Sequence, residues 1–429
     1  MKFLHLSLLV LPLIANATPT HPQLGHRSYK GYKIFRVTPE NATFIRPHLQ
    51  SLAAVEMSNT HGSTGRQIID VAIPPSQIDA FNALGLVTEI LSEDLGADIA
   101  LEGKLTPFPG FETDSLSAAT GPALPKASWF KHYHPDADHL TFLKGLQQAF
   151  PSNSEIVTAG TSWENRPIRG IHIWGSGDPN SKPAIIFHGN TVEYIAYQLI
   201  NTYRNNDTVV QAVLDNHDFY IFPIVNPDGF NYTQTNDRLW RKNRQRRYGL
   251  SAVGTDPYRN WPYQWDGVGS SGDPESDSYR GQQPADTPET QGLQSHGDHL
   301  SATQGIKLYI DFHSYGQHIL TPYGYSCTAE PANRVDQNSL AEDMVAAMHG
   351  AHGKRFTAGP LCSSLYTVAG SSNDYFTDVA AAQYSWVIEL RGRPKFTLPP
   401  SEILPSGEET WAGLKALWEN FQYEGHSKK

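Results

Sequence analysis

The chain has 429 residues, of which 39% are hydrophobic, and its 33 basic and 43 acidic side chains give a net charge of -10. This length is sufficient for a large core and for more than one domain. The acidic balance argues against a nucleic-acid partner, and the single basic cluster, residues 238–247, is too short to reverse it.

The first apolar run predicts an export signal. Lys2 precedes a long apolar stretch that ends in Ala-Asn-Ala, the small-x-small pattern of a cleavage site. We expect a signal peptide over residues 1–17 and a secreted, extracellular protein with no membrane span. The alternative is a buried N-terminal helix, but the stretch has no polar face. Acceptor sequons at Asn41, Asn206 and Asn231 agree with a secreted glycoprotein.

The chain has two cysteines, Cys327 and Cys362. In an exported protein we expect them to form one disulfide, since oxidising compartments favour the bond. Two free thiols are the structural alternative.

Residues 18–125 predict a small α+β unit and a connector. Alternating strand patterns and helical spacing follow one another, with strands at residues 32–37 and 67–74 and helices at residues 51–57 and 75–85. Residues 104–125 are rich in Pro, Gly, Ser and Thr without a sustained period. This composition is typical of an exposed connector, where we expect proteolytic processing.

From residue 126 to residue 429 strands and helices alternate. Strands are predicted at residues 154–160, 168–175, 183–189, 217–225, 306–314 and 384–391, and helices at 137–150, 191–204, 339–350 and 409–421. This order predicts an α/β domain with a largely buried mixed sheet. Functional residues in such sheets gather where strands end.

Four side chains suggest chemistry, and two of them, His313 and Glu389, lie near such positions. His313 ends an apolar strand, and Glu389 lies inside another, where an ionised carboxylate is costly unless it is paired or bound to a metal. A salt bridge from Glu389 to Arg391 or to another arginine is the structural alternative. Arg241 and Arg259 lie in cationic and aromatic segments, and each alone would be interpreted as surface charge.

Seven motifs occur together in one order, namely SWENRPIRGIHI, NPDGF, RLWRKNR, RNWPYQW, DFHSYGQ, LYTVAGSSNDY and ELR. On these motifs the chain resembles the carboxypeptidase A family of zinc metallocarboxypeptidases, of the secreted fungal kind, over nearly its whole length. The resemblance implies an α/β fold with a mixed eight-stranded sheet flanked by helices. It also implies a monomer and a small α+β pro-domain that covers the cleft and inhibits the enzyme.

The resemblance assigns catalytic roles to three positions. His313 matches a zinc ligand, Glu389 matches the general base, and Arg241 matches the arginine that polarises the scissile carbonyl. Catalytic zinc takes three protein ligands and leaves one position for water. The implied cofactor is zinc and the implied reaction is hydrolysis of the C-terminal residue of peptides and proteins.

Substrate binding is assigned in the same way. Arg259 and Tyr366 match the groups that hold the terminal carboxylate, and Tyr258 occupies the place of an asparagine that assists Arg259. Asn373 matches the base of the pocket for the terminal side chain. An uncharged residue there implies apolar or polar uncharged C-terminal residues.

The chain departs from the family at the first two zinc ligands. The family carries His-x-x-Glu after a strand and a glycine, but only Asn190 separates Gly189 from Thr191, where we expect about ten more residues that include both ligands. His188 and Glu193 are five residues apart, which is poor spacing on a helix for a shared metal. We therefore expect His188 to pack near the strand end and Glu193 to face solvent.

Three interpretations of this gap remain open. The chain lacks a short piece of a zinc carboxypeptidase, as a misread intron boundary would produce. Alternatively, it is a zinc-free protein that binds peptide C-termini without cutting them, because one histidine does not hold catalytic zinc well. In the third interpretation, the shortened connection between strand and helix leaves the chain misfolded.

Overall fold

The protein is described by a computed structural model that covers residues 26–37, 48–49, 51–61, 67–108, 123–189, 191–392 and 396–424. The predicted signal peptide, the sequon at Asn41, residue Asn190 and part of the predicted connector lie outside the described residues.

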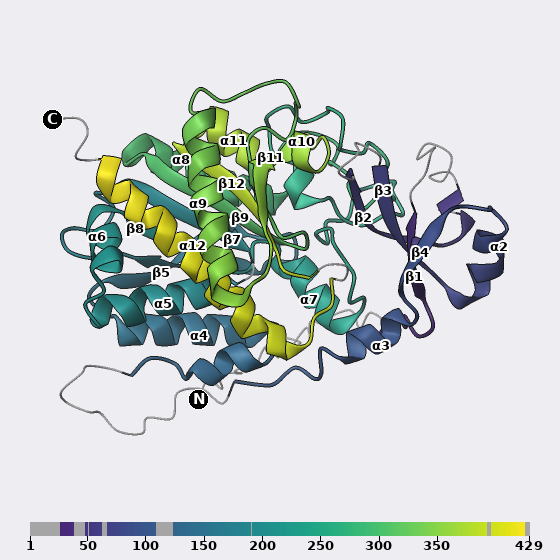
Figure 1. Ribbon diagram of the computed structural model, residues 1–429, viewed down its shortest axis with the longest axis horizontal. Coiled ribbons are helices and arrows are strands. Elements are labelled where there is room, and N and C mark those ends of the chain that lie inside the picture. Colours follow the sequence, from purple (N-terminus) through teal and green to yellow (C-terminus); the bar gives the residue numbers. More distant parts are fainter. Residues whose placement is uncertain are drawn as a thin grey trace, which may run out of the picture.

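The elements follow one another along the chain as strands and helices, with short 3-10 turns between some of them (Figure 1). The strands are β1 (Lys33–Val37), β2 (Val55–His61), β3 (Gln67–Ile73), β4 (Thr88–Ser92), β5 (Ser154–Thr161), β6 (Pro167–Ile173), β7 (Ala184–Gly189), β8 (Asp218–Phe222), β9 (Ile306–Ser314), β10 (His318–Thr321), β11 (Thr357–Pro360) and β12 (Tyr384–Leu390). The helices are α2 (Ile78–Asn82), α3 (Leu95–Ala100), α4 (Asp136–Ala149), α5 (Val192–Arg204), α6 (Thr208–Asn216), α7 (Pro227–Thr235), α8 (Pro288–Thr303), α9 (Arg334–His352), α10 (Leu361–Ser364), α11 (Ser372–Asp378) and α12 (Ile403–Glu424).

In the described residues the larger sheet has eight strands in the order β11-β10-β12-β9-β7-β8-β6-β5. Its central strands β8, β7, β9 and β12 are parallel, while β10 is antiparallel to β12 and β6 is antiparallel to β8. This confirms the predicted mixed eight-stranded α/β sheet. The carboxyl ends of the central strands therefore meet along one edge, which is where ligands bind in such sheets.

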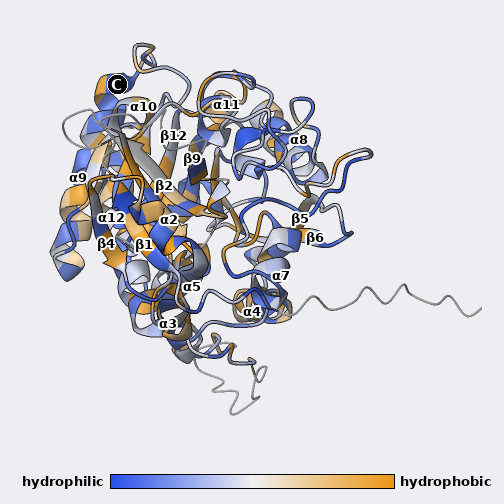
Figure 2. Cartoon of the chain, turned by 90° about the vertical axis from the view of Figure 1, so that its right-hand side faces the viewer, coloured by the Kyte–Doolittle hydropathy of each residue, from blue (hydrophilic) through white to orange (hydrophobic). Residues whose placement is uncertain are grey.

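Alternate residues of the central strands face opposite layers, as the pleat of a strand requires. Ile185 and Phe187 pack with α4, α5, α9 and α12 in one apolar cluster, whereas Ile186 and Tyr309 pack with α8 and α11 in another. In Figure 2 the turns of α9 and α12 carry both hydrophobic and hydrophilic residues, as expected for helices that cover a sheet on one side only.

A second sheet of four strands, in the order β2-β3-β1-β4, forms with α2 and α3 the N-terminal α+β unit that the pattern predicts. The prediction of a helix over residues 51–57 is wrong, because strand β2 begins at Val55 and pairs with β3. The stretch is too short for an isolated helix to be stable, and pairing with a neighbouring strand satisfies its backbone groups.

Ion pairs and hydrogen bonds join the N-terminal unit to the rest of the molecule, beside the larger sheet (Figure 1). Arg238 donates two hydrogen bonds to the Glu102 carboxylate, from Nε at 2.7 Å and from Nη2 at 2.5 Å. The Tyr29 hydroxyl donates to Asp237 at 2.6 Å, and Arg27 pairs with the same carboxylate at 3.2 Å. These contacts hold the N-terminal unit against the segment that follows α7.

Cys327 and Cys362 form the predicted disulfide, and the alternative of two free thiols is wrong. The bond ties α10 to the segment that follows β10. Within the described ranges, no helix combines the length and the hydrophobicity that crossing a membrane requires.

We predict that the Cys327→Ala/Cys362→Ala double variant lowers the free energy of unfolding by about 3 kcal/mol, because the bond closes a long loop and its loss enlarges the unfolded ensemble. Denaturant unfolding followed by intrinsic tryptophan fluorescence measures this. A reducing agent should produce the same loss in the wild type and none in the double variant. An unchanged midpoint would contradict the prediction.

Candidate active site

The predicted site begins where two parallel strands end side by side. In the register of β9 and β12, His313 is paired with Glu389, and in the register of β7 and β9, His188 is paired with Asp311. The sheet itself therefore brings His313 and Glu389 together, although 76 residues separate them in the chain.

His313 is held by a carboxylate from its own strand. Its Nε2 lies 3.2 Å from Oδ1 of Asp311, and Oδ2 of Asp311 accepts a hydrogen bond from the Ser372 hydroxyl at 2.7 Å. Burial opposes protonation, but Asp311 raises the pKa of His313 above its ordinary value. A histidine whose one ring nitrogen is bonded to a carboxylate offers the other to a metal, an arrangement typical of metal ligands. His313 therefore fits its assigned role.

The carboxylate of Glu389 has one oxygen that is free to bind a ligand or water. Burial raises its pKa, although His313 and Arg241 oppose this shift, and its Oε2 has no hydrogen-bond partner among the described residues. The alternative of a salt bridge to Arg391 is wrong, because that guanidinium binds Glu409 at 2.6 Å and Glu402 at 2.6 Å. The predicted base is thus half-buried, close to His313 and without a hydrogen bond at Oε2 among the described residues.

Asp256 organises both predicted arginines. Its Oδ2 accepts from Nε of Arg241 at 3.0 Å and lies 3.9 Å from Nη1 of Arg259, while its Oδ1 accepts from the backbone N–H of Tyr258 at 3.0 Å. Arg259 also donates from Nε to the carbonyl of Gly269 at 2.8 Å. Both arginines thereby converge on one carboxylate.

Arg259 is a buried cation with unused donors. The residue is only 4% exposed, so the interpretation as surface charge is wrong for it, and its Nη1 has no hydrogen-bond partner in the described part of the chain. Buried polar groups normally find partners. A guanidinium in this state is suited to a carboxylate ligand, which it binds through parallel hydrogen bonds.

Tyr258, which the resemblance places beside Arg259, lies next to Asn373. The Tyr258 hydroxyl donates to Oδ1 of Asn373 at 2.8 Å, and its ring packs on His313 with centroids 4.5 Å apart. Tyr258 thus binds Asn373 rather than assisting Arg259 by a hydrogen bond. Tyr366 packs against a small apolar cluster that contains Tyr258 and residues of β10 and β12.

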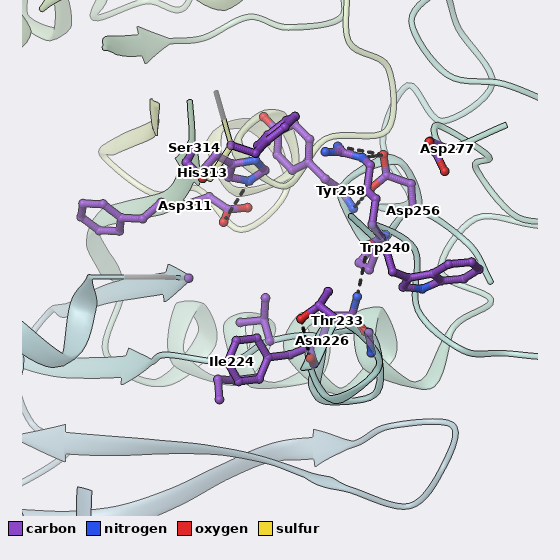
Figure 3. Close-up of a pocket in the computed structure, with 18 of the residues that line it drawn as sticks. Ile224, Asn226, Thr233, Trp240, Asp256, Tyr258, Asp277, Asp311, His313 and Ser314 are labelled. Carbon is purple, nitrogen blue, oxygen red and sulfur yellow. Dashed lines mark hydrogen bonds and ion pairs between the residues drawn. The ribbon is translucent and has the colours of Figure 1, made fainter. Parts of the chain in front are cut away.

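A cavity of about 400 Å³ opens beside these residues, and its lining includes Arg241, Asp256, Tyr258, Asp311 and His313 (Figure 3). Figure 3 shows Tyr258 and Asp256 between His313 on one side and Asp277 on the other. Arg259 and Asn373 do not line the cavity themselves, although each contacts the lining residue Tyr258.

At the end of β7, where the family's zinc motif is absent, Gly189 lies directly against the backbone of β9. Gly189 has φ 103°, and a side chain there would collide with the carbonyl oxygen of Phe312. His188 is buried as expected, with Nδ1 at 3.1 Å from the Tyr309 hydroxyl. Glu193, which was expected in solvent, is only 9% exposed.

Glu193 is buried because two partners on other elements bind it. Nε1 of Trp129 donates to it at 3.0 Å, and Nδ1 of His139 lies 2.8 Å away. These partners are distant in sequence, so the pattern around Glu193 gave no sign of them. The prediction that Glu193 faces solvent is therefore wrong, and its carboxylate is committed away from His313.

The donor set does not fit catalytic zinc. Within the described ranges, no three His, Cys, Asp or Glu side chains lie close enough to share a metal ion. His313 supplies one suitable ligand, whereas His188 and Glu193 are engaged elsewhere. Since catalytic zinc takes three protein ligands, the residues present hold part of such a site only.

The sequence interpretation missed Asp256. Its signal was present, because Asp-Pro-x-Arg places a capping side chain just before a proline at the first position of a helical turn. The contacts of this carboxylate with both arginines form only when the chain folds, so no local sequence pattern indicates them.

Three comparisons place the chain among known proteins. The family described as zinc carboxypeptidase matches residues 139–413. Metallocarboxypeptidase A of Trichophyton rubrum is 40% identical over 426 residues, covering 96% of this chain and 98% of the relative. The chain therefore belongs to the zinc carboxypeptidase family.

Solved structures agree on the fold. Carboxypeptidase A from Helicoverpa armigera superposes with a TM-score of 0.76 at 25% identity, covering 92% of this chain and 98% of that one. Thrombin activatable fibrinolysis inhibitor gives a TM-score of 0.77 at 24% identity over 91% and 99% of the two chains. The latter likeness concerns the fold alone.

We predict that His188 makes stability depend on pH. Burial lowers its pKa to about 4 from the ordinary 6.5, so between these values the unfolded chain binds a proton that the native chain does not. The free energy of unfolding therefore falls as the pH drops from 6.5 towards 4. The contribution of this histidine to that fall is about 3 kcal/mol at most.

Denaturant unfolding across this pH range provides the measurement. The His188→Gln variant should lose less stability than the wild type between pH 6.5 and pH 4, whereas the variant of an exposed histidine, His132→Gln, should follow the wild type. Identical profiles for all three proteins would refute the assignment.

Proposed function

We propose that the protein is a secreted metallocarboxypeptidase that acts on the C-terminal residue of peptides. The observation that carries the proposal is Arg259, a buried guanidinium held beside a cavity, whose Nη1 makes no hydrogen bond with the described residues. A buried cation with spare donors is best satisfied by a carboxylate. In a peptide, such a group is found at the chain end, which explains selection of the last residue.

Arg241 and Glu389 would act at the bond to be cut. Arg241 lines the cavity and is held by Asp256, so its remaining N–H groups are fixed in position to stabilise negative charge on the carbonyl oxygen. The uncommitted carboxylate of Glu389 would take a proton from the attacking water. Both roles come from the family resemblance, and the geometry supports them.

The terminal side chain would meet a neutral surface. The Tyr258 hydroxyl and the Asn373 amide satisfy each other by a hydrogen bond, and Tyr366 adds an aromatic ring to the same cluster. A neutral pocket does not offset the desolvation of a charged side chain. We therefore propose a preference for apolar or polar uncharged C-terminal residues over Lys or Arg.

Binding without cleavage is a second candidate function, and the donor set favours it. With one suitable histidine among the described residues, tight binding of zinc by this site is not expected. The carboxylate-binding side of the site does not depend on the missing ligands. The chain as it stands would then bind peptide C-termini and release them unchanged.

We predict that Arg259→Gln weakens binding of a peptide with a free C-terminus by about 10- to 100-fold, because hydrogen bonds to charged groups are lost. Isothermal calorimetry with an acetylated tetrapeptide ending in Phe measures the affinity. The matched controls are the same peptide as its C-terminal amide, which should bind the wild type as weakly, and the exposed-residue variant Arg246→Gln, which should bind normally.

Mass spectrometry of the same mixtures, with equimolar zinc added, distinguishes the two candidates. Release of free Phe supports the carboxypeptidase, and tight binding without release supports the second candidate. If neither binding nor release depends on the free carboxylate, both candidates fail.

Sequencing of the transcript across the codons for Gly189 and Thr191 shows whether a segment with the two absent ligands is encoded.

The N-terminal unit would act as an inhibitory pro-domain for this site. Val55, Glu56 and Met57 of β2 line the same cavity as Arg241 and His313, and the Arg238–Glu102 pair holds the unit in place. A strand across the cavity competes with a peptide for the same space. We propose that residues 18–125 keep the exported protein inactive until the connector is cut.

A protease site engineered into residues 104–125 tests this proposal. After cleavage, we expect peptide affinity to increase at least about tenfold. The cut unit is no longer tethered to the cavity, so its effective concentration there falls and it competes less with the peptide. The uncut protein is the control. Equal affinity before and after cleavage, with the fragment shown to have dissociated, would exclude an inhibitory role.

A further inference from the structure

The charged side chains that line the cavity are mostly paired, with one exception. Arg238 is paired with Glu102, Arg241 with Asp256 and His313 with Asp311. The carboxylate of Asp277 also faces the cavity, but it makes no hydrogen bond or ion pair with the described residues. The residue is exposed at the mouth of the cavity, and partial desolvation by the surrounding chain raises the pKa of Asp277 while Arg241 and Lys242 oppose the shift.

The backbone around Asp277 is well fixed. Ser271 and Tyr279 form an isolated bridge, and the N–H of Ser271 donates to the carbonyl of Ser278 at 3.0 Å. Nζ of the buried Lys242 donates to the carbonyl of Pro274 at 2.7 Å. The loop therefore presents the Asp277 side chain from a defined backbone, as a selective contact requires.

The position of Asp277 relative to the arginines decides which part of a peptide it meets. It lies near Arg241 and Lys242, and in Figure 3 it lies beyond Asp256 from His313. With the terminal carboxylate at Arg259, a peptide that passes Arg241 reaches Asp277 with residues that precede the last one. The contact is thus outside the pocket for the terminal side chain.

We propose that Asp277 is a specificity-determining residue that selects a cationic side chain in the peptide segment upstream of the terminal residue. Its carboxylate is an acceptor without a partner, so a Lys or Arg of the ligand completes an ion pair rather than displacing one. The inference rests on the proposed function, because it assumes that a peptide C-terminus occupies Arg259.

The selection should be modest and sensitive to salt. Exposed ion pairs are weak, so we expect about two- to fivefold tighter binding of a cationic peptide. Screening should remove most of this preference at about 0.5 M salt. Asp256, which already holds two arginines, is not available to give the same effect.

Calorimetry with acetylated tetrapeptides ending in Phe provides the test, on the full chain before and after cleavage of the connector. Lys or Gln is placed at each of the three positions before Phe. In the wild type, at one of these positions, the Lys peptide should bind about two- to fivefold more tightly than the Gln peptide at low salt. In Asp277→Asn the two should bind equally, with the affinity for the Gln peptide unchanged.

Glu275→Gln is the matched control, since this acid lies on the same loop but does not line the cavity. It should keep the wild-type preference for Lys. Equal binding of Lys and Gln peptides by the wild type, or a preference that survives in Asp277→Asn, would overturn the inference while peptide binding itself stands. If no peptide with a free C-terminus binds, the proposed function fails and the inference fails with it.

Discussion

The ligand-binding side of this molecule depends on one buried carboxylate. Asp256 accepts a backbone N–H at the start of a helical turn and faces Arg241 and Arg259 with the same side chain. Burying the Arg259 guanidinium without a counter-charge would be strongly unfavourable, and the same acid also pairs with the more exposed Arg241. One acid for two arginines leaves a net positive charge, so the pair is stable in the fold and still attracts an anion.

The metal-binding side is organised separately. His313 depends on Asp311 and on the register of β9 with β12, whereas the absent ligands belong to the connection between β7 and α5. Helix α5 still packs on the sheet after this short connection, with Glu193 bound by Trp129 and His139. Loss of zinc ligands therefore need not disturb the core or the arginines, and this argues against the interpretation of a misfolded chain.

Much of the fold was predictable from the sequence, because the central strands are continuous apolar runs between helical patterns. Helix α8 was missed because its sequence has few apolar residues, although Thr287 caps it and Pro288 starts it. The motifs located His313, Glu389 and the arginines by resemblance. Contacts between distant segments, such as Glu193 with Trp129, have no local signature, so burial of that glutamate was not predictable.

The distribution of charge along the cavity links the two sides. Arg259 lies next to the lining residue Tyr258 with an unused Nη1, Arg241 and Asp256 pair with each other on the lining, and Asp277 makes no ion pair with the described residues. A peptide with a terminal carboxylate and an upstream cation has the complementary arrangement. Complementary charge determines specificity and orientation more than affinity. It would therefore align such a peptide with its last bond at Arg241 whether or not the bond is then cut.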